Sequence, residues 1–243
     1  MKLSIVGQDS LALATATCCR RHFDVLAEPG VTADILWVCY DTPTGPDNRP
    51  DADWVCAKIH GHLGQIDPTV PVLISSQLPV GTTARLEKDH PAFTFAYSPE
   101  NIRVANAVSD FENQARVVVG VRNDDNNSLL NKLFAPFTRN IIFTTPETAE
   151  MSKTALNCFL ALQIAWINEI ARVCETVGAD ASVVSQAVRS DARVSPKAPL
   201  RPGAPFGGGH LERELFTLGE LAMTHGVCIP IITHINESNR VSV

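Results

Sequence analysis

The apolar residues of this chain change their spacing near residue 145, and this change constrains the fold more than any other feature of the sequence. Before it, seven short apolar segments recur, each typical of a buried strand, with helix-length segments between several of them. The segments are 3–6, 24–27, 34–39, 70–75, 93–97, 116–121 and 140–143. Alternating strands and helices predict an α/β domain over residues 1–145, with a parallel sheet wrapped by helices.

Residues 146–243 show no further strand pattern. Pro146 suits the first turn of a helix with Thr145 as its cap, and apolar residues then follow at spacings of three and four up to Gly178. This pattern predicts one helix over 146–177, about 45 Å long. Shorter helices are expected over 180–189 and 210–225, joined by a loop rich in Pro and Gly. The second part, 146–243, is therefore predicted to be a helical domain built on one long helix.

Composition excludes several classes of protein. The chain has 243 residues, 45% of them hydrophobic and 19% charged, as in ordinary globular proteins. A net charge of −6 and the lack of a basic stripe argue against a nucleic-acid partner. No apolar run of about 20 residues is present, and residues 1–7 resemble a strand and turn rather than a signal peptide, so we expect a cytoplasmic protein without a membrane segment. The seven cysteines show no C-x-x-C spacing and are expected to be reduced thiols, with no metal site.

The turn after the first strand has the position of a dinucleotide-binding fingerprint. Gly7 ends the strand, Asp9 and Ser10 open a helix, and Glu28 follows 21 residues after Gly7, where an acid can bind a ribose hydroxyl. Asp9 stands where a second glycine would let backbone amides approach a pyrophosphate. A like-charge pair at 4 Å costs about 1 kcal/mol in water and about 4 kcal/mol near a protein surface, so Asp9 opposes NAD binding. Alternatively, Asp9 caps the helix and replaces the bound anion.

Five further segments carry polar residues where elements begin or end. They are Asp41-Thr42-Pro43, Ser75-Ser76-Gln77 with Gly81-Thr82, Tyr97-Ser98-Pro99-Glu100, the segment from Glu147 through Lys153 to Asn157, and Phe206-Gly-Gly-Gly-His210-Leu-Glu-Arg213-Glu214. In this order they resemble motifs of the nucleotide-sugar 6-dehydrogenases, the UDP-glucose/GDP-mannose dehydrogenase family. The resemblance covers nearly the whole chain. It implies a Rossmann-like domain that binds NAD, with Thr42, Pro43, Ser76 and Gln77 beside the coenzyme.

The same resemblance implies residues for the NAD-dependent oxidation of a sugar C6 alcohol. Lys153 and Asn157 match the family's helix pair, on one helix face, where the ammonium stabilises an oxyanion and the amide orients water. Glu100 matches a family carboxylate, and Glu214 takes the place of the family's aspartate. The structural alternatives are a solvent-facing polar pair for Lys153 and Asn157, and a helix-start ion pair for Glu214 with Arg213.

Three departures from the family affect the chemistry. His210 stands where the family has a nucleophilic cysteine, which traps the aldehyde as a thiohemiacetal and must be a thiolate. An imidazole can act as a base for a single alcohol-to-aldehyde step. The family's threonine and second glutamate are replaced by Gln77 and Val104. The site is therefore expected to be degenerate, and to support at most an oxidation of a sugar alcohol. The alternative is a non-catalytic binding or assembly protein that keeps the fold.

The family resemblance, the length of the chain and its long helix give further expectations about domains and partners. The family usually continues into a third domain that binds the nucleotide of the sugar, and we expect this chain to lack it. Only four residues separate Glu28 from Ala33, so the coenzyme domain is expected to be trimmed. The helix over 146–177 is apolar on more than one face, which predicts a homodimer along it unless the C-terminal helices cover it. A nucleotide sugar is the expected ligand.

Overall fold

The computed structural model describes residues 1–27, 32–45, 49–100, 103–207 and 210–241. The chain divides into two compact units. The first consists of Met1–Gly45 and Pro50–Lys153, and the second of Pro46–Arg49 and Thr154–Val243. Glu28 lies outside the described residues, so its expected contact with a ribose stays a prediction.

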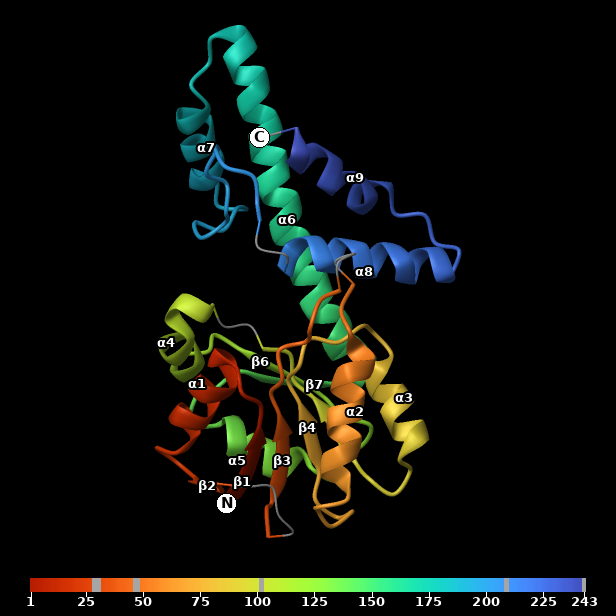
Figure 1. The fold of residues 1–243 in the computed structure, drawn as a ribbon. Coiled ribbons are helices and arrows are strands. Elements are labelled where there is room, and N and C mark those ends of the chain that lie inside the picture. Colours follow the sequence, from red (N-terminus) through yellow and green to blue (C-terminus); the bar gives the residue numbers. More distant parts are fainter. Residues whose placement is uncertain (28–31, 46–48, 101–102, 208–209, 242–243) are drawn as a thin grey trace. The chain divides into compact units, whose positions relative to one another are not determined.

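The first unit contains a seven-stranded sheet whose strands alternate with helices (Figure 1). The strands are β1 Lys2–Val6, β2 Asp24–Val25, β3 Ile35–Val38, β4 Val72–Ile74, β5 Phe95–Tyr97, β6 Val117–Gly120 and β7 Ile141–Thr144. The helices are α1 Ser10–Cys19, α2 Ala52–Leu63, α3 Thr82–Asp89, α4 Ala107–Glu112 and α5 Asn127–Phe134, with a short 3-10 turn at Val104–Asn106. Each of the seven predicted strands overlaps an observed one, so the predicted α/β class is confirmed.

The sheet has the strand order β2-β1-β3-β4-β5-β6-β7. All neighbours are parallel except β5 and β6, so the prediction of a purely parallel sheet is wrong for this pair. The segment between them carries α4, which packs on α1 instead of crossing back along the sheet. The chain therefore enters β6 at the same edge of the sheet where β5 ended. An antiparallel connection of this kind needs no crossover helix.

Helices cover both faces of this sheet, which is why β3 is apolar at every position. Ile35 and Trp37 of β3 belong to a core cluster that also contains residues of α1, α4 and α5. Leu36 and Val38 point the other way, into a cluster with residues of α2 and α3. All four side chains are almost completely buried. The continuous apolar run is typical of a strand buried on both faces.

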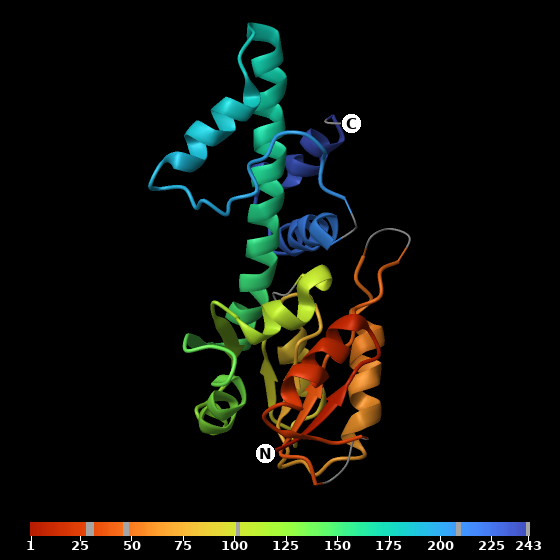
Figure 2. The same ribbon diagram turned by 90° about the vertical axis from the view of Figure 1, so that its left-hand side faces the viewer.

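The second unit is organised around one long helix. This helix, α6, spans Pro146–Val177 and ends before Gly178, which has a left-handed φ of 71°. The other helices are α7 Ala181–Ser190, α8 His210–Thr224 and α9 Pro230–Arg240. One core cluster joins α6 to α8 and α9, and another joins it to α7 and the loop after α7. Accordingly, α7 lies on one side of α6 and the other two helices on the opposite side (Figures 1 and 2). The long predicted helix is confirmed.

A stripe of apolar side chains on α6 stays exposed although the other helices pack on it. Phe159, Trp166 and Val173 are 55%, 39% and 59% exposed, and they recur every seven residues. By length and hydropathy alone, α6 is also the one described helix that reaches the requirements for a membrane span. The spacing of apolar residues in the sequence did not predict such a segment. Core helices of soluble proteins meet the same requirements of length and hydropathy.

Candidate active site

The carboxylate of Asp9 accepts hydrogen bonds from backbone amides at one edge of the sheet. A dinucleotide-binding fold holds its ligand at this edge. Its Oδ1 accepts hydrogen bonds from the amides of Leu11 and Ala12, each at 2.9 Å. Its Oδ2 accepts one from the amide of Asp41 at 2.7 Å. Asp9 follows β1 and Asp41 follows β3, and the strand order reverses between these two strands, which is where such folds bind nucleotides. The capping role is confirmed, and the residues present do not fit a pyrophosphate here.

Gly7 is required by packing and not only by a ligand. Its φ is 151°, and a Cβ at this position would lie 2.5 Å from the carbonyl oxygen of Cys39 and 2.6 Å from the Cβ of Ala12. Both distances are far below contact, so any side chain would push α1 away from the sheet. Ser10, the first residue of α1, is exposed. The retained first glycine is therefore explained by the fold itself.

The turns after β3 and β4, which carry residues expected beside the coenzyme, come together. Thr42 is buried, and its hydroxyl donates to the carbonyl oxygen of Gln77 at 2.6 Å. Ser76 is also buried, and its hydroxyl oxygen has no hydrogen-bond partner among the described residues. Pro43 is exposed beside Thr42. These four residues line the same edge of the sheet as Asp9, because parallel strands end at one edge.

Glu100 and Lys153 are brought together in the first unit. The ammonium of Lys153 donates to the backbone carbonyl of Glu100 at 2.6 Å, and the hydroxyl of Thr15 donates to the Glu100 carboxylate at 3.4 Å. Burial and, to a smaller extent, the charge of Asp9 raise the pKa of Glu100 to about 7, although the charge of Lys153 acts in the opposite direction. The alternative of a purely solvent-facing Lys153 is therefore wrong. A carboxyl that titrates near neutral pH is typical of functional sites.

The remaining predicted site residues lie in the second unit. Asn157 on α6 is 8% exposed and thus not a solvent-facing residue. His210 begins α8 and is exposed, with its Nδ1 3.2 Å from a guanidinium nitrogen of Arg213. Arg213 and Glu214 are both buried. Burial, together with the smaller effect of the Glu214 charge, raises the pKa of Cys158 to about 12, so this buried cysteine does not supply a thiolate at neutral pH.

Sequence reasoning missed a buried carboxylate that holds the turn after β4. Glu150, in the first turns of α6, is 1% exposed, and its carboxylate accepts hydrogen bonds from the amides of Gly81 and Thr83 and from the Thr83 hydroxyl at 2.6–2.9 Å. It thereby caps α3, whose own N-cap residue is a glycine. The glycine could have indicated that another residue caps α3, because glycine supplies no side-chain acceptor. No feature of the sequence indicated that Thr15 contacts Glu100. Within the described ranges, no group of three metal-ligating side chains is present.

Comparisons with known proteins agree with the resemblance. Residues 7–138 match the NAD binding domain of the UDP-glucose/GDP-mannose dehydrogenase family, and residues 147–241 match its central domain. UDP-glucose 6-dehydrogenase TuaD of Bacillus subtilis (strain 168) is 31% identical over 214 residues, which cover 85% of this chain and 46% of that protein. The chain thus spans about half the length of the curated relatives it matches.

Solved structures show the same fold. A UDP-glucose dehydrogenase from the archaeon Pyrobaculum islandicum superposes with a TM-score of 0.84 at 21% identity, covering 99% of this chain and 68% of that one. A UDP-D-ManNAc dehydrogenase from Pyrococcus horikoshii gives a TM-score of 0.85 at 19% identity, with the same coverage of 99% and 68%. Because both family domains match in order between residues 7 and 241, the chain belongs to the UDP-glucose/GDP-mannose dehydrogenase family.

Proposed function

We propose that this chain is a nucleotide-sugar dehydrogenase-like protein with a degenerate active site, and that it serves as a binding or assembly protein instead of oxidising a sugar. The observation that carries the proposal is the position of the Asp9 carboxylate. It already accepts three amide hydrogen bonds at the edge of the sheet where a pyrophosphate would need them. A diphosphate placed against it would also meet a like charge, at a cost of about 1 to 4 kcal/mol for each close pair.

The second unit supports the same proposal. The family's four-electron oxidation needs a thiolate that forms a covalent intermediate. His210 stands at that position, and Cys158, the cysteine next to Glu214, is buried with a pKa of about 12. A thiol with such a pKa is almost entirely protonated at neutral pH. Among the described residues around Glu214, Cys158 therefore does not supply the thiolate that the covalent step needs.

A single oxidation of a sugar alcohol is the second candidate, and one observation favours it. Glu100 has a pKa of about 7 and lies beside the Lys153 ammonium. A base with this pKa accepts a proton efficiently near neutral pH. This candidate requires the Asp9 carboxylate to leave the amides of Leu11, Ala12 and Asp41, because the coenzyme of the family needs that edge of the sheet.

We further propose that a second copy of the chain covers the exposed stripe on α6. Phe159, Trp166 and Val173 recur every seven residues, the period at which two helices pack along a shared seam. Exposed aromatic residues of this kind are typical of the centres of interfaces. We place the protein in the cytoplasm, because all seven cysteines are free thiols and four of them are completely or almost completely buried at 0–4% exposure.

A turnover assay tests the proposed function. The purified chain is incubated with NAD and either UDP-glucose or GDP-mannose, and NADH is followed by absorbance, with an authentic UDP-glucose 6-dehydrogenase as the positive control. We expect no NADH. One NADH per sugar, with an aldehyde product, would instead support the single oxidation. Two NADH per sugar would overturn the proposal, because that stoichiometry needs the complete family mechanism.

A further inference from the structure

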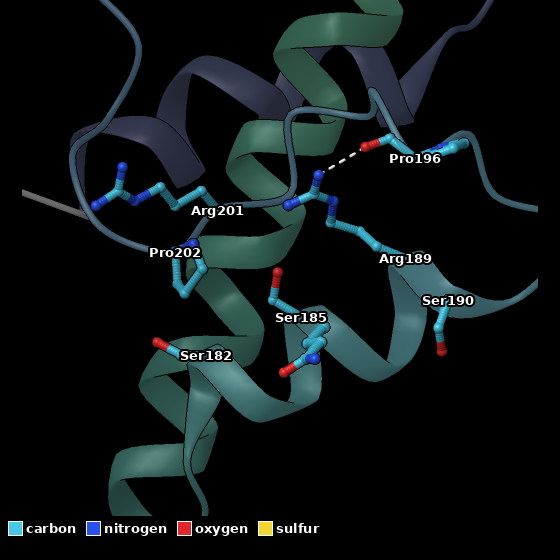
Figure 3. A pocket seen from close by; sticks show the side chains of 8 residues that line it. Ser182, Ser185, Arg189, Ser190, Pro196, Arg201 and Pro202 are labelled. Atoms are coloured by element: carbon cyan, nitrogen blue, oxygen red, sulfur yellow. Dashed lines mark hydrogen bonds between the residues drawn. The ribbon is translucent and has the colours of Figure 1, made fainter.

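A pocket in the second unit lies outside the residues that the family motifs assign. It has a volume of about 480 Å³ and opens between α7 and the facing segment 196–202 (Figure 3). Ser182, Gln186 and Arg189 line it from α7, and their spacing places them on one face of that helix. Pro196 and Arg201 line it from the facing segment. A volume of this size suits a small molecule.

Two hydrogen bonds hold the walls of this pocket together. The hydroxyl of Ser185, a residue that is 5% exposed, donates to the carbonyl oxygen of Leu200. A guanidinium nitrogen of Arg189 donates to the carbonyl oxygen of Pro196 at 2.6 Å, as the dashed line in Figure 3 marks. Both bonds join α7 to the facing segment. The pocket is therefore formed before any ligand binds, and the Arg189 side chain pays little entropy on binding.

The charge of the pocket is positive although the chain as a whole has a net charge of −6. Its charged residues are Arg189 and Arg201, and none of the described residues that line it is acidic. The acidic residues at the two ends of α7 have other partners. Asp180 caps the helix, and Asp191 forms an ion pair with Arg193. Two guanidinium groups without a carboxylate favour an anionic ligand.

The other polar groups of the pocket suit a ligand rich in hydrogen-bond acceptors and hydroxyls. Over the described ranges, the side chains of Ser182, Gln186 and Arg201 make no hydrogen bond, so their donors are available. We propose that this pocket binds a small anionic molecule. Its phosphate or carboxylate is held by Arg201, whose guanidinium group lies apart from that of Arg189 in Figure 3, and its other polar groups contact Arg189, Ser182 and Gln186. The proposal does not depend on the function proposed above, because it uses none of the same residues.

Isothermal titration calorimetry of the full chain tests this site with glucose 6-phosphate, inorganic phosphate, succinate and uncharged glucose. We expect at least one of the three anions to bind and glucose not to bind. Preference for the phosphates or for succinate decides whether the ligand is a phosphate or a carboxylate. Arg201→Gln should weaken binding at least about tenfold, since it removes a charge-assisted hydrogen bond. The matched control Arg193→Gln removes an exposed arginine that does not line the pocket, and should leave the affinity unchanged.

Arg189→Lys adds a test of geometry, because lysine keeps the charge but loses the planar fork of arginine. It should weaken binding less than Arg201→Gln while its melting temperature stays close to that of the parent. The proposal is overturned if none of the three anions binds at millimolar concentration. It is equally overturned if Arg201→Gln binds as tightly as the parent, since the anion would then lie elsewhere on the chain.

Discussion

The carboxylate of Asp9 accepts a hydrogen bond from the backbone amide of Asp41 at 2.7 Å, and this bond joins the ends of two neighbouring strands. The same carboxylate caps α1 through two further amides. Folds of this kind bind their anionic ligand between the ends of those two strands. The chain therefore carries an anion of its own at that place. The carboxylate that stabilises the turn is also the group on which the proposed loss of coenzyme binding depends.

The stability of the first unit should depend on pH through Glu100. Its pKa is raised from 4.5 to about 7, so the folded chain holds this proton more tightly than the unfolded chain does. The stabilisation is complete below pH 4.5 and is lost as the pH rises through about 7, with a total of about 3 kcal/mol. Glu100→Gln imitates the protonated acid and should remove this loss. Urea unfolding of both proteins between about pH 3 and pH 8 measures the difference.

Glu147→Gln is the control for that experiment, because the pKa of Glu147 is lowered whereas that of Glu100 is raised. Hydrogen bonds from Arg122 lower the pKa of Glu147, so its contribution is present at neutral pH and is lost as the pH falls. The free energy of unfolding of Glu147→Gln should approach that of the parent at low pH. If Glu100→Gln and the parent lose stability in parallel up to pH 8, Glu100 does not titrate near neutral pH.

Glu150→Ala should strongly destabilise the first unit. The change leaves the buried amide and hydroxyl of Thr83 and the partly buried amide of Gly81 without their acceptor, which costs about 3 kcal/mol. Glu147→Ala, three residues earlier on the same helix, removes only a partly exposed ion pair with Arg122 and should cost about 1 kcal/mol or less. Denaturant unfolding followed by circular dichroism compares the two variants. Equal costs would show that Glu150 does not hold the turn.

Arginine in the α6 stripe should separate the proposed dimer. Val173 and Val183 are both 59% exposed, but only Val173 belongs to the stripe with Phe159 and Trp166. Val173→Arg or Phe159→Arg should raise the dimer dissociation constant at least about 30-fold, because each places a charge in an apolar seam. Val183→Arg should leave it unchanged. Sedimentation velocity measures the constants, and a parent that is monomeric at micromolar concentration would refute the dimer.

The sequence predicted the elements better than the contacts between them. Strand and helix positions followed from local spacing, and the end of α6 followed from Gly178. The antiparallel entry of β6 could not be predicted, because it depends on α4 packing against α1, whose residues lie far away in the sequence. The bond from Asp9 to Asp41 spans 32 residues, and those from Glu150 to Gly81 and Thr83 span 69 and 67. No local sequence pattern indicates hydrogen bonds between residues so far apart in the chain.

In the candidate site too, the residues could be identified from the sequence but their environment could not. Lys153, Glu100, Thr42 and Gln77 were identified through their resemblance to family motifs, and the structure brings Lys153 to Glu100 and Thr42 to Gln77. The burial that raises the pKa of Glu100 could not be seen in the sequence, because it is a property of the packed chain.

A fluorescence titration of NADH tests the central claim that Asp9 closes the coenzyme site. The parent, Asp9→Gly and Asp180→Gly are compared at modest ionic strength. Asp180 caps α7 through two amides much as Asp9 caps α1, so its variant controls for the loss of a helix cap alone. We predict that Asp9→Gly binds NADH at least about 100-fold more tightly than the parent, because a charge repulsion of a few kcal/mol is removed. Asp180→Gly should behave like the parent. A micromolar dissociation constant in the parent, unchanged by Asp9→Gly, would contradict the account.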